Sequence, residues 1–169
     1  MSLSMYQAAV PTLIRALSNL GDVLAKGAQH AEAKKIAPEA LLGARLYPDM
    51  FPLSKQIQVA SDISKGGCSR LAQVDPPAFE DNETTFADLV ERTRKTVAYL
   101  KTLKPEQIDG SEQRTITWTV RGNQRSMQGQ QYLFNHVLPN VFFHCTTAYD
   151  ILRHNGVELG KMDFLGKPD

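Results

Sequence analysis

The stretch NHVLPNVFFHCTTAYDILRHNG, residues 135–156, decides the fold of this chain. Its apolar side chains recur three and four residues apart, at Val137, Val141, Ala148 and Leu152. That period is typical of an α-helix, and a stripe widened by further apolar neighbours favours the central helix of a helical bundle. Asn155-Gly156 is a suitable left-handed end for such a helix, and Pro139 suggests a break near its start.

Three more segments show the same helical period. They cover residues 3–26, which contain Pro11, residues 51–71, and residues 86–104. Thr85 followed by Asp88 resembles a capping box that opens the third of these. Shorter helical turns are predicted at residues 30–35 and 38–42, and the tail from 157 to 169 is expected to be an irregular extended arm.

A segment of period two interrupts the helices. Residues 115–120 alternate and are rich in β-branched side chains, residues 121–123 favour a turn, and residues 124–128 can return as a second strand. Because an isolated hairpin is marginally stable, Ile116, Trp118 and Val120 are expected to lie against the helices.

These elements predict an all-α fold: a four-helix bundle with a small inserted β-hairpin, in one domain over residues 1–169. The connection of about 25 residues between the first two long helices is too long for a tight turn, so a crossover connection is favoured.

Composition excludes several classes of function. The net charge is +1, from 19 basic and 18 acidic residues that are interspersed, so neither nucleic acid nor a membrane surface is an expected partner. Cys68 and Cys145 lie within apolar helical patterns, which favours buried free thiols and a cytoplasmic protein. Neither a signal peptide nor a membrane-spanning run is predicted.

Three polar residues on the central helix are candidates for a site. His136, Asn140 and His144 are four residues apart and so lie on one helical face, where facing helices could complete a metal site. His136 and His144 are about 12 Å apart along a helix, which is too far for one ion without a bend. The alternative is a hydrogen-bonded His144 at the core edge and a partly exposed His136.

Gln56 is the other unusual residue, because it lies beside the apolar stripe of the helix over 51–71. A buried amide left unpaired costs about 1–3 kcal/mol, so Gln56 needs partners. It could bond His144 or Asn140 across the core, or instead a neighbouring backbone carbonyl or water.

Three strings in the chain resemble a known family. They are RLYPDMFPLSKQIQVASD (45–62), FEDNETTFADLVERTRKTVAYL (79–100) and FFHCTTAYDILRHNGVELGKMDFLG (142–166). The chain is similar to an uncharacterised bacterial family, a domain of unknown function (nineteen ninety-three). That family is grouped with the DinB/YfiT-like superfamily of proposed metalloenzymes. The resemblance implies a cytoplasmic DinB-like four-helix bundle, often a homodimer.

The resemblance also implies a site. Many DinB-like relatives hold a divalent metal with three histidines, and some are thiol-dependent transferases or isomerases. His144 matches one of these ligands, whereas Asn140 and Gln56 stand where the others would be, and carboxamides are weaker zinc or nickel ligands than imidazole. The expectation is a degenerate metal site that survives as a polar pocket of Gln56, His136, Asn140 and His144 for a small molecule. The alternative is a metal-dependent DinB-like enzyme.

Overall fold

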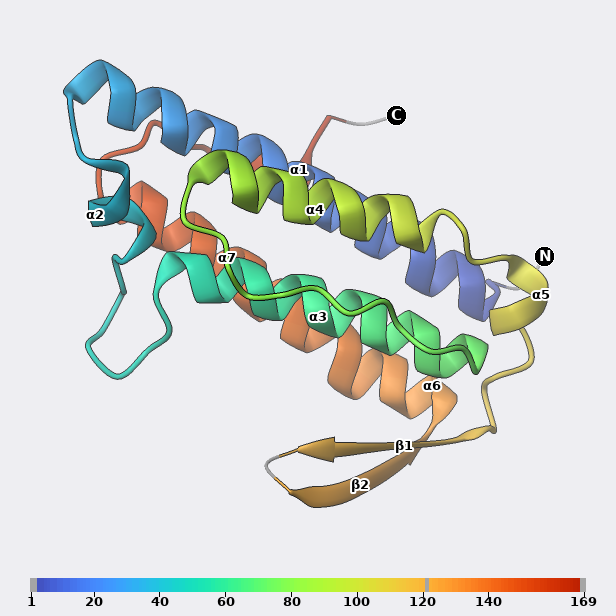
Figure 1. The fold of residues 1–169 in the computed structure, drawn as a ribbon. Coiled ribbons are helices and arrows are strands. Elements are labelled where there is room, and N and C mark those ends of the chain that lie inside the picture. The colour runs from blue at the N-terminus through green and yellow to red at the C-terminus, as the bar shows by residue number, and fades with distance from the viewer. Residues whose placement is uncertain (1–2, 121, 168–169) are drawn as a thin grey trace.

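The computed structural model describes residues 3–120 and 122–167, and it is mostly helical with one two-stranded antiparallel sheet (Figure 1). This confirms the predicted helical class and the small hairpin. The long helices are α1 (Met5–Lys34), α3 (Leu53–Ala72), α4 (Phe86–Leu100) and α7 (Leu138–His154). The shorter ones are α2 (Pro38–Leu42), α5 (Pro105–Ile108), α6 (Gly129–Tyr132), the π-helical turn η1 (Leu133–Val137) and α8 (Lys161–Leu165). Of the helices described, none has the length and apolar character needed to span a bilayer.

The four long helices pack around a shared core. Helix α1 lies beside α4 and α7, and α3 lies beside the same two helices. Helices α3 and α4 run in one direction, whereas α1 and α7 run in the other (Figure 1). The apolar stripes of all four meet between them, with side chains that are fully buried: Leu13, Leu17, Leu53, Ile57, Leu89, Val141 and Ile151.

Local sequence signals fix several helix ends. The Thr85 side chain accepts the Asp88 N–H at 3.1 Å, and Asp88 Oδ2 accepts the Thr85 N–H at 2.9 Å, so the predicted capping box is confirmed. Gly156, at φ +91°, provides the left-handed residue expected after α7.

Two predictions about the helices were wrong. Helix α1 continues through residues 30–34 instead of stopping near 26, and α7 is preceded by the π-helical turn rather than broken at Pro139.

The C-terminal tail is more ordered than predicted. Val157 and Leu159 are buried in an irregular stretch, and α8 follows them, so the expected irregular arm is wrong for residues 161–165. The Asn19 amide donates to the Phe164 carbonyl at 2.9 Å, and the Lys26 ammonium pairs with Asp163 at 2.6 Å. The tail therefore folds back onto α1.

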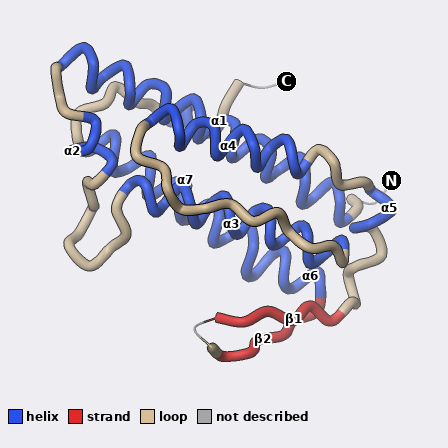
Figure 2. Tube along the Cα trace, in the orientation of Figure 1, coloured by secondary structure: helices blue, strands red, loops and turns tan. Residues whose placement is uncertain are grey.

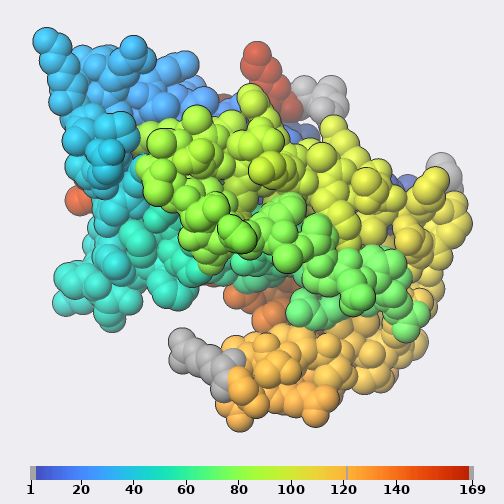
Figure 3. Space-filling view, viewed as in Figure 1, coloured from blue at the N-terminus to red at the C-terminus, as the bar shows by residue number. Residues whose placement is uncertain are grey.

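The hairpin is formed by β1 (Thr115–Val120) and β2 (Asn123–Gln128), with Ile116 opposite Met127 and Trp118 opposite Arg125 (Figure 2). Ile116 and Trp118 are buried as expected, but Val120 is 42% exposed, so its predicted packing is wrong. The reason is visible in Figure 3, where the outer half of the hairpin stands clear of the helices. Arg121, in the predicted turn, lies outside the described residues.

The crossover predicted between the first two long helices is wrong in its place, because α1 and α3 run in opposite directions (Figure 1). Helices α3 and α4 run in the same direction, so the chain must travel back between them. Helix α3 has 20 residues, about 30 Å. Residues 73–85, the return segment, reach about 43 Å when fully extended. The segment contains no helix or strand and lies along both helices (Figure 1). It can therefore span the distance only in an extended form, which side chains must hold in place.

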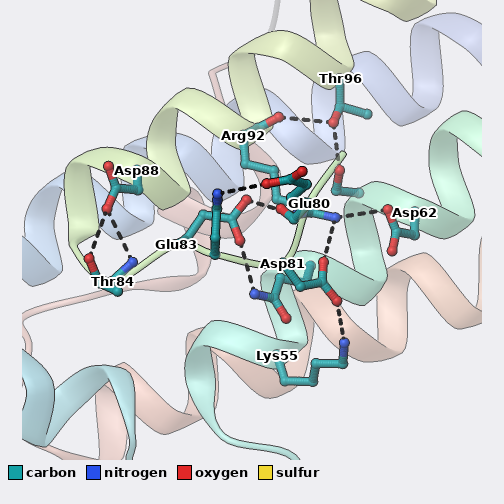
Figure 4. Close-up of polar contacts among 12 residues, drawn as sticks. Lys55, Asp62, Glu80, Asp81, Glu83, Thr84, Asp88, Arg92 and Thr96 are labelled. Carbon is teal, nitrogen blue, oxygen red and sulfur yellow. Dashed lines mark hydrogen bonds and ion pairs between the residues drawn. The ribbon is translucent and has the colours of Figure 1, made fainter. Parts of the chain in front are cut away.

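Arg92 on α4 holds the return segment (Figure 4). Its guanidinium, which is 1% exposed, donates to the Glu80 carbonyl at 3.0 Å and to Glu83 at 2.7 Å. It also pairs with Asp81 at 3.0 Å and with Asp62 of α3 at 2.9 Å. Burial alone lowers the pKa of Arg92, but these carboxylates outweigh burial and raise it. One cation thus joins α3, α4 and the segment between them.

We expect Arg92→Met to lower the free energy of unfolding by about 3 kcal/mol, because it leaves the nearly buried Glu83 without its cation. Asp62 and Asp81 are more than a third exposed, so their share is small. Urea unfolding measures the change. Arg94→Met, an exposed position on the same helix, is the control and should change stability by less than about 0.5 kcal/mol. Equal small losses in both variants would contradict the role given to Arg92.

Candidate functional site

The centre of the candidate site is a hydrogen bond between α3 and α7. His144 Nδ1 lies 2.6 Å from Gln56 Oε1, and the two side chains are 8% and 1% exposed. Both residues project from the apolar faces along which these helices pack. Of the partners considered for Gln56, the structure pairs it with two: His144, and a backbone carbonyl, because its Nε2 donates to the Phe51 oxygen at 3.0 Å.

These two bonds fix the protonation of the His144 ring. The Phe51 carbonyl can only accept, so Gln56 must present its NH₂ group there and its oxygen to His144. An amide oxygen can only accept, so Nδ1 of His144 carries the proton and donates. The neutral ring then has its lone pair on Nε2. Nε2 of His144 can therefore accept a hydrogen bond, act as a base or bind a metal ion as one ligand.

The surroundings of His144 keep the ring neutral. Burial lowers the pKa of His144 below its ordinary value of 6.5. The Phe143 ring lies edge-on to the imidazole at 5.2 Å between centroids. Within the described residues, the buried side-chain polar atoms that lack a partner are Arg92 Nε, Ser111 Oγ and Trp118 Nε1. Nε2 of His144 makes no hydrogen bond to any described residue. It is not one of these three fully buried atoms, so it retains contact with solvent.

His136 and Asn140 form a second polar pair. The Asn140 amide donates to the His136 carbonyl at 2.6 Å and lies 3.5 Å from His136 Nδ1. The structure therefore joins Gln56 with His144, and Asn140 with His136. No hydrogen bond links one pair to the other among the described residues.

His136 belongs to an aromatic cluster under the hairpin. Its ring lies 4.7 Å from Trp118 and stacks on Tyr132 at 5.4 Å. Burial, with a smaller contribution from the charge of Arg70, lowers the pKa of His136. The π-helical turn η1 carries His136, so the residue lies one widened turn before α7 rather than in regular helical register with His144.

The described residues contain no group of three His, Cys, Asp or Glu side chains placed to hold a metal ion. Cys68 and Cys145 are buried, and burial raises the pKa of each thiol to about 12. Such thiols are poor nucleophiles. The Arg92 cluster was not predicted from the sequence, although one signal for it exists. Arg92 falls three residues after Leu89 and four before Thr96, on the buried side of α4.

Comparison with solved structures places this fold in a known class. The chain is similar to the crystal structure of a DinB family member protein from Shewanella denitrificans. The two share 37% sequence identity with a TM-score of 0.88, over 96% of this chain and 92% of that one. The fold is therefore DinB-like. The profile of the family described as "Domain of unknown function (DUF1993)" matches residues 5–165, and the chain belongs to that family. No curated protein matches it.

We expect stability to fall as the pH drops below about 6.5, because the fold keeps two imidazoles neutral. The pKa values of His136 and His144 are lowered in the folded chain. Their contribution is therefore complete above the ordinary value of 6.5 and is lost as the pH falls through the folded values. His144→Gln should flatten this slope in urea unfolding measured across the range. His154→Gln, at an exposed position, should keep the wild-type slope, and equal slopes in all three proteins would contradict the assignment.

Proposed function

We propose that this DinB-like protein binds a small molecule at the polar site of Gln56 and His144, with Asn140 and His136 at its edge. The observation that carries the proposal is the Gln56–His144 hydrogen bond, which presents a neutral imidazole with its Nε2 lone pair toward solvent. Such a group binds the O–H or N–H of a ligand. Figure 3 shows a hollow between the hairpin and the helices, with atoms of α7 at its back.

The same bond supports a ligand-binding role without the superfamily's metal. A carboxamide, Gln56, holds His144 in place of a second imidazole, and Asn140 bonds a backbone carbonyl. Amide oxygens bind zinc and nickel less strongly than imidazole. One strong ligand is too few for a site that normally takes three or four.

The alternative is a metal-dependent enzyme of the transferase or isomerase type. One observation favours it: an Nδ1–H held by an oxygen, with Nε2 available, is also how metal-binding histidines are oriented. The homodimer and the cytoplasmic location implied by the resemblance stay predictions.

A screen of uncharged fragments that carry O–H or N–H donors, followed by ligand-observed NMR, tests the binding proposal. We expect binders that shift the ¹⁵N signals of the His144 ring and lose at least tenfold affinity in His144→Ala, because one hydrogen bond of about 1.4 kcal/mol equals a factor of ten. The same variant should lose about 1–3 kcal/mol of stability, since Gln56 loses its partner. His154→Ala is the control. Binders with unchanged affinity in His144→Ala would refute the site.

Elemental analysis separates the two functions. For protein purified without chelator or nickel column, we expect zinc, nickel and iron far below one atom per chain, both in wild type and in His144→Ala. Stoichiometric metal that disappears in His144→Ala would instead establish the metal-dependent alternative.

A further inference from the structure

A second concave site, partly open to solvent, lies on the other side of α7 and is lined by residues of α1, α7 and α8. It has a volume of about 210 Å³ and is lined mainly by apolar side chains: Ala16, Leu20, Phe142, Cys145, Tyr149 and Phe164. Adjacent helical residues point about 100° apart. His144 faces α3 while Cys145 faces this cavity, so the two sites share a helix and no side chain.

Helix α8 forms one wall of the cavity without being part of the core. None of its residues, Lys161–Leu165, is buried. Polar contacts hold its C-terminal end. Arg15 donates to the carbonyls of Leu165 and Lys167 at 3.0 and 2.9 Å, and Asn19 donates to the Phe164 carbonyl at 2.9 Å. Arg15 and Asn19 of α1 are thus engaged with the backbone of the tail, and most of the remaining lining is apolar.

The size and lining indicate what the cavity accepts. An engineered apolar cavity of about 150 Å³ in another protein stays dry and binds benzene. Here Tyr149 and Phe164 meet edge to face at 6.3 Å, and Phe142 adds a third ring, 37% exposed. Aromatic edges and faces favour another ring over water. We propose that the cavity between α1, α7 and α8 binds a small apolar molecule of one aromatic ring.

Toluene is a suitable probe, with binding measured by the melting temperature and by ¹H–¹⁵N NMR of the full chain. We expect toluene to raise the melting temperature and to shift backbone signals of α1, α7 and α8. Ala16→Phe fills the cavity and should lower the affinity at least tenfold. Ala87→Phe makes the same substitution at an exposed position of α4 and should bind as wild type does.

A second variant keeps the test valid if Ala16→Phe fails to fold. Phe164→Ala removes one ring from α8, which has no buried residue, so the fold should persist while toluene binds several-fold more weakly. Absence of binding to wild type, or unchanged affinity in both cavity variants, would overturn the proposal.

Sedimentation velocity gives the remaining outcome. If wild type is a dimer that Ala16→Phe converts to a monomer of 18.8 kDa, this face is a contact between two copies of the chain and the proposal is wrong. A mass that is the same in both proteins, with toluene bound by wild type alone, supports a ligand cavity.

Discussion

The buried guanidinium of Arg92 is the interaction on which the arrangement of the helices depends. Parallel neighbours cannot be joined by a short turn, so α3 and α4 require a return segment of nearly their own length. An extended segment without backbone hydrogen bonds of its own has a large conformational entropy to lose. Arg92 offsets that loss by bonding a carbonyl and two acidic side chains of the segment together with Asp62 of α3. One side chain thereby ties α4 both to the return segment and to α3, which carries Gln56.

The position of α3 in turn decides the chemistry of His144. An imidazole by itself has two interchangeable tautomers, and a buried one has no fixed direction in which to accept. Gln56 removes that freedom because its amide is already oriented by the Phe51 carbonyl. The backbone just before α3 therefore determines which nitrogen on α7 is available. The two hydrogen bonds that join the Phe51 carbonyl, Gln56 and His144 involve no charged group. This agrees with a His144 pKa that is lowered by burial alone.

The sequence was a reliable guide where one local signal had one structural meaning. The stripes of α3 and α4, the Thr85–Asp88 capping box, Gly156 and the β1 strand are of this kind. Pairing across the core was foreseen only as a set of options, because nothing local says whether Gln56 bonds His144, Asn140 or a backbone carbonyl. The Arg92 cluster, the π-helical turn and α8 were missed. The π-helical turn and α8 are stabilised by contacts far along the chain, such as Lys26 with Asp163, and such contacts leave no periodic trace. The Arg92 cluster left only one signal, the place of Arg92 on the buried side of α4.

The π-helical turn explains why the predicted column of three polar residues is split between two hydrogen-bonded pairs. In a regular helix His136, Asn140 and His144 would repeat along one face. One widened turn before Leu138 instead carries His136 toward Trp118 and Tyr132, and Asn140 bonds back to it. His144 instead forms its hydrogen bond with Gln56 of α3. The next residue, Cys145, faces α1 across an apolar cavity. Helix α7 therefore presents one oriented imidazole within its packed face toward α3 and an apolar cavity toward α1. A ligand suited to one face has no reason to enter the other.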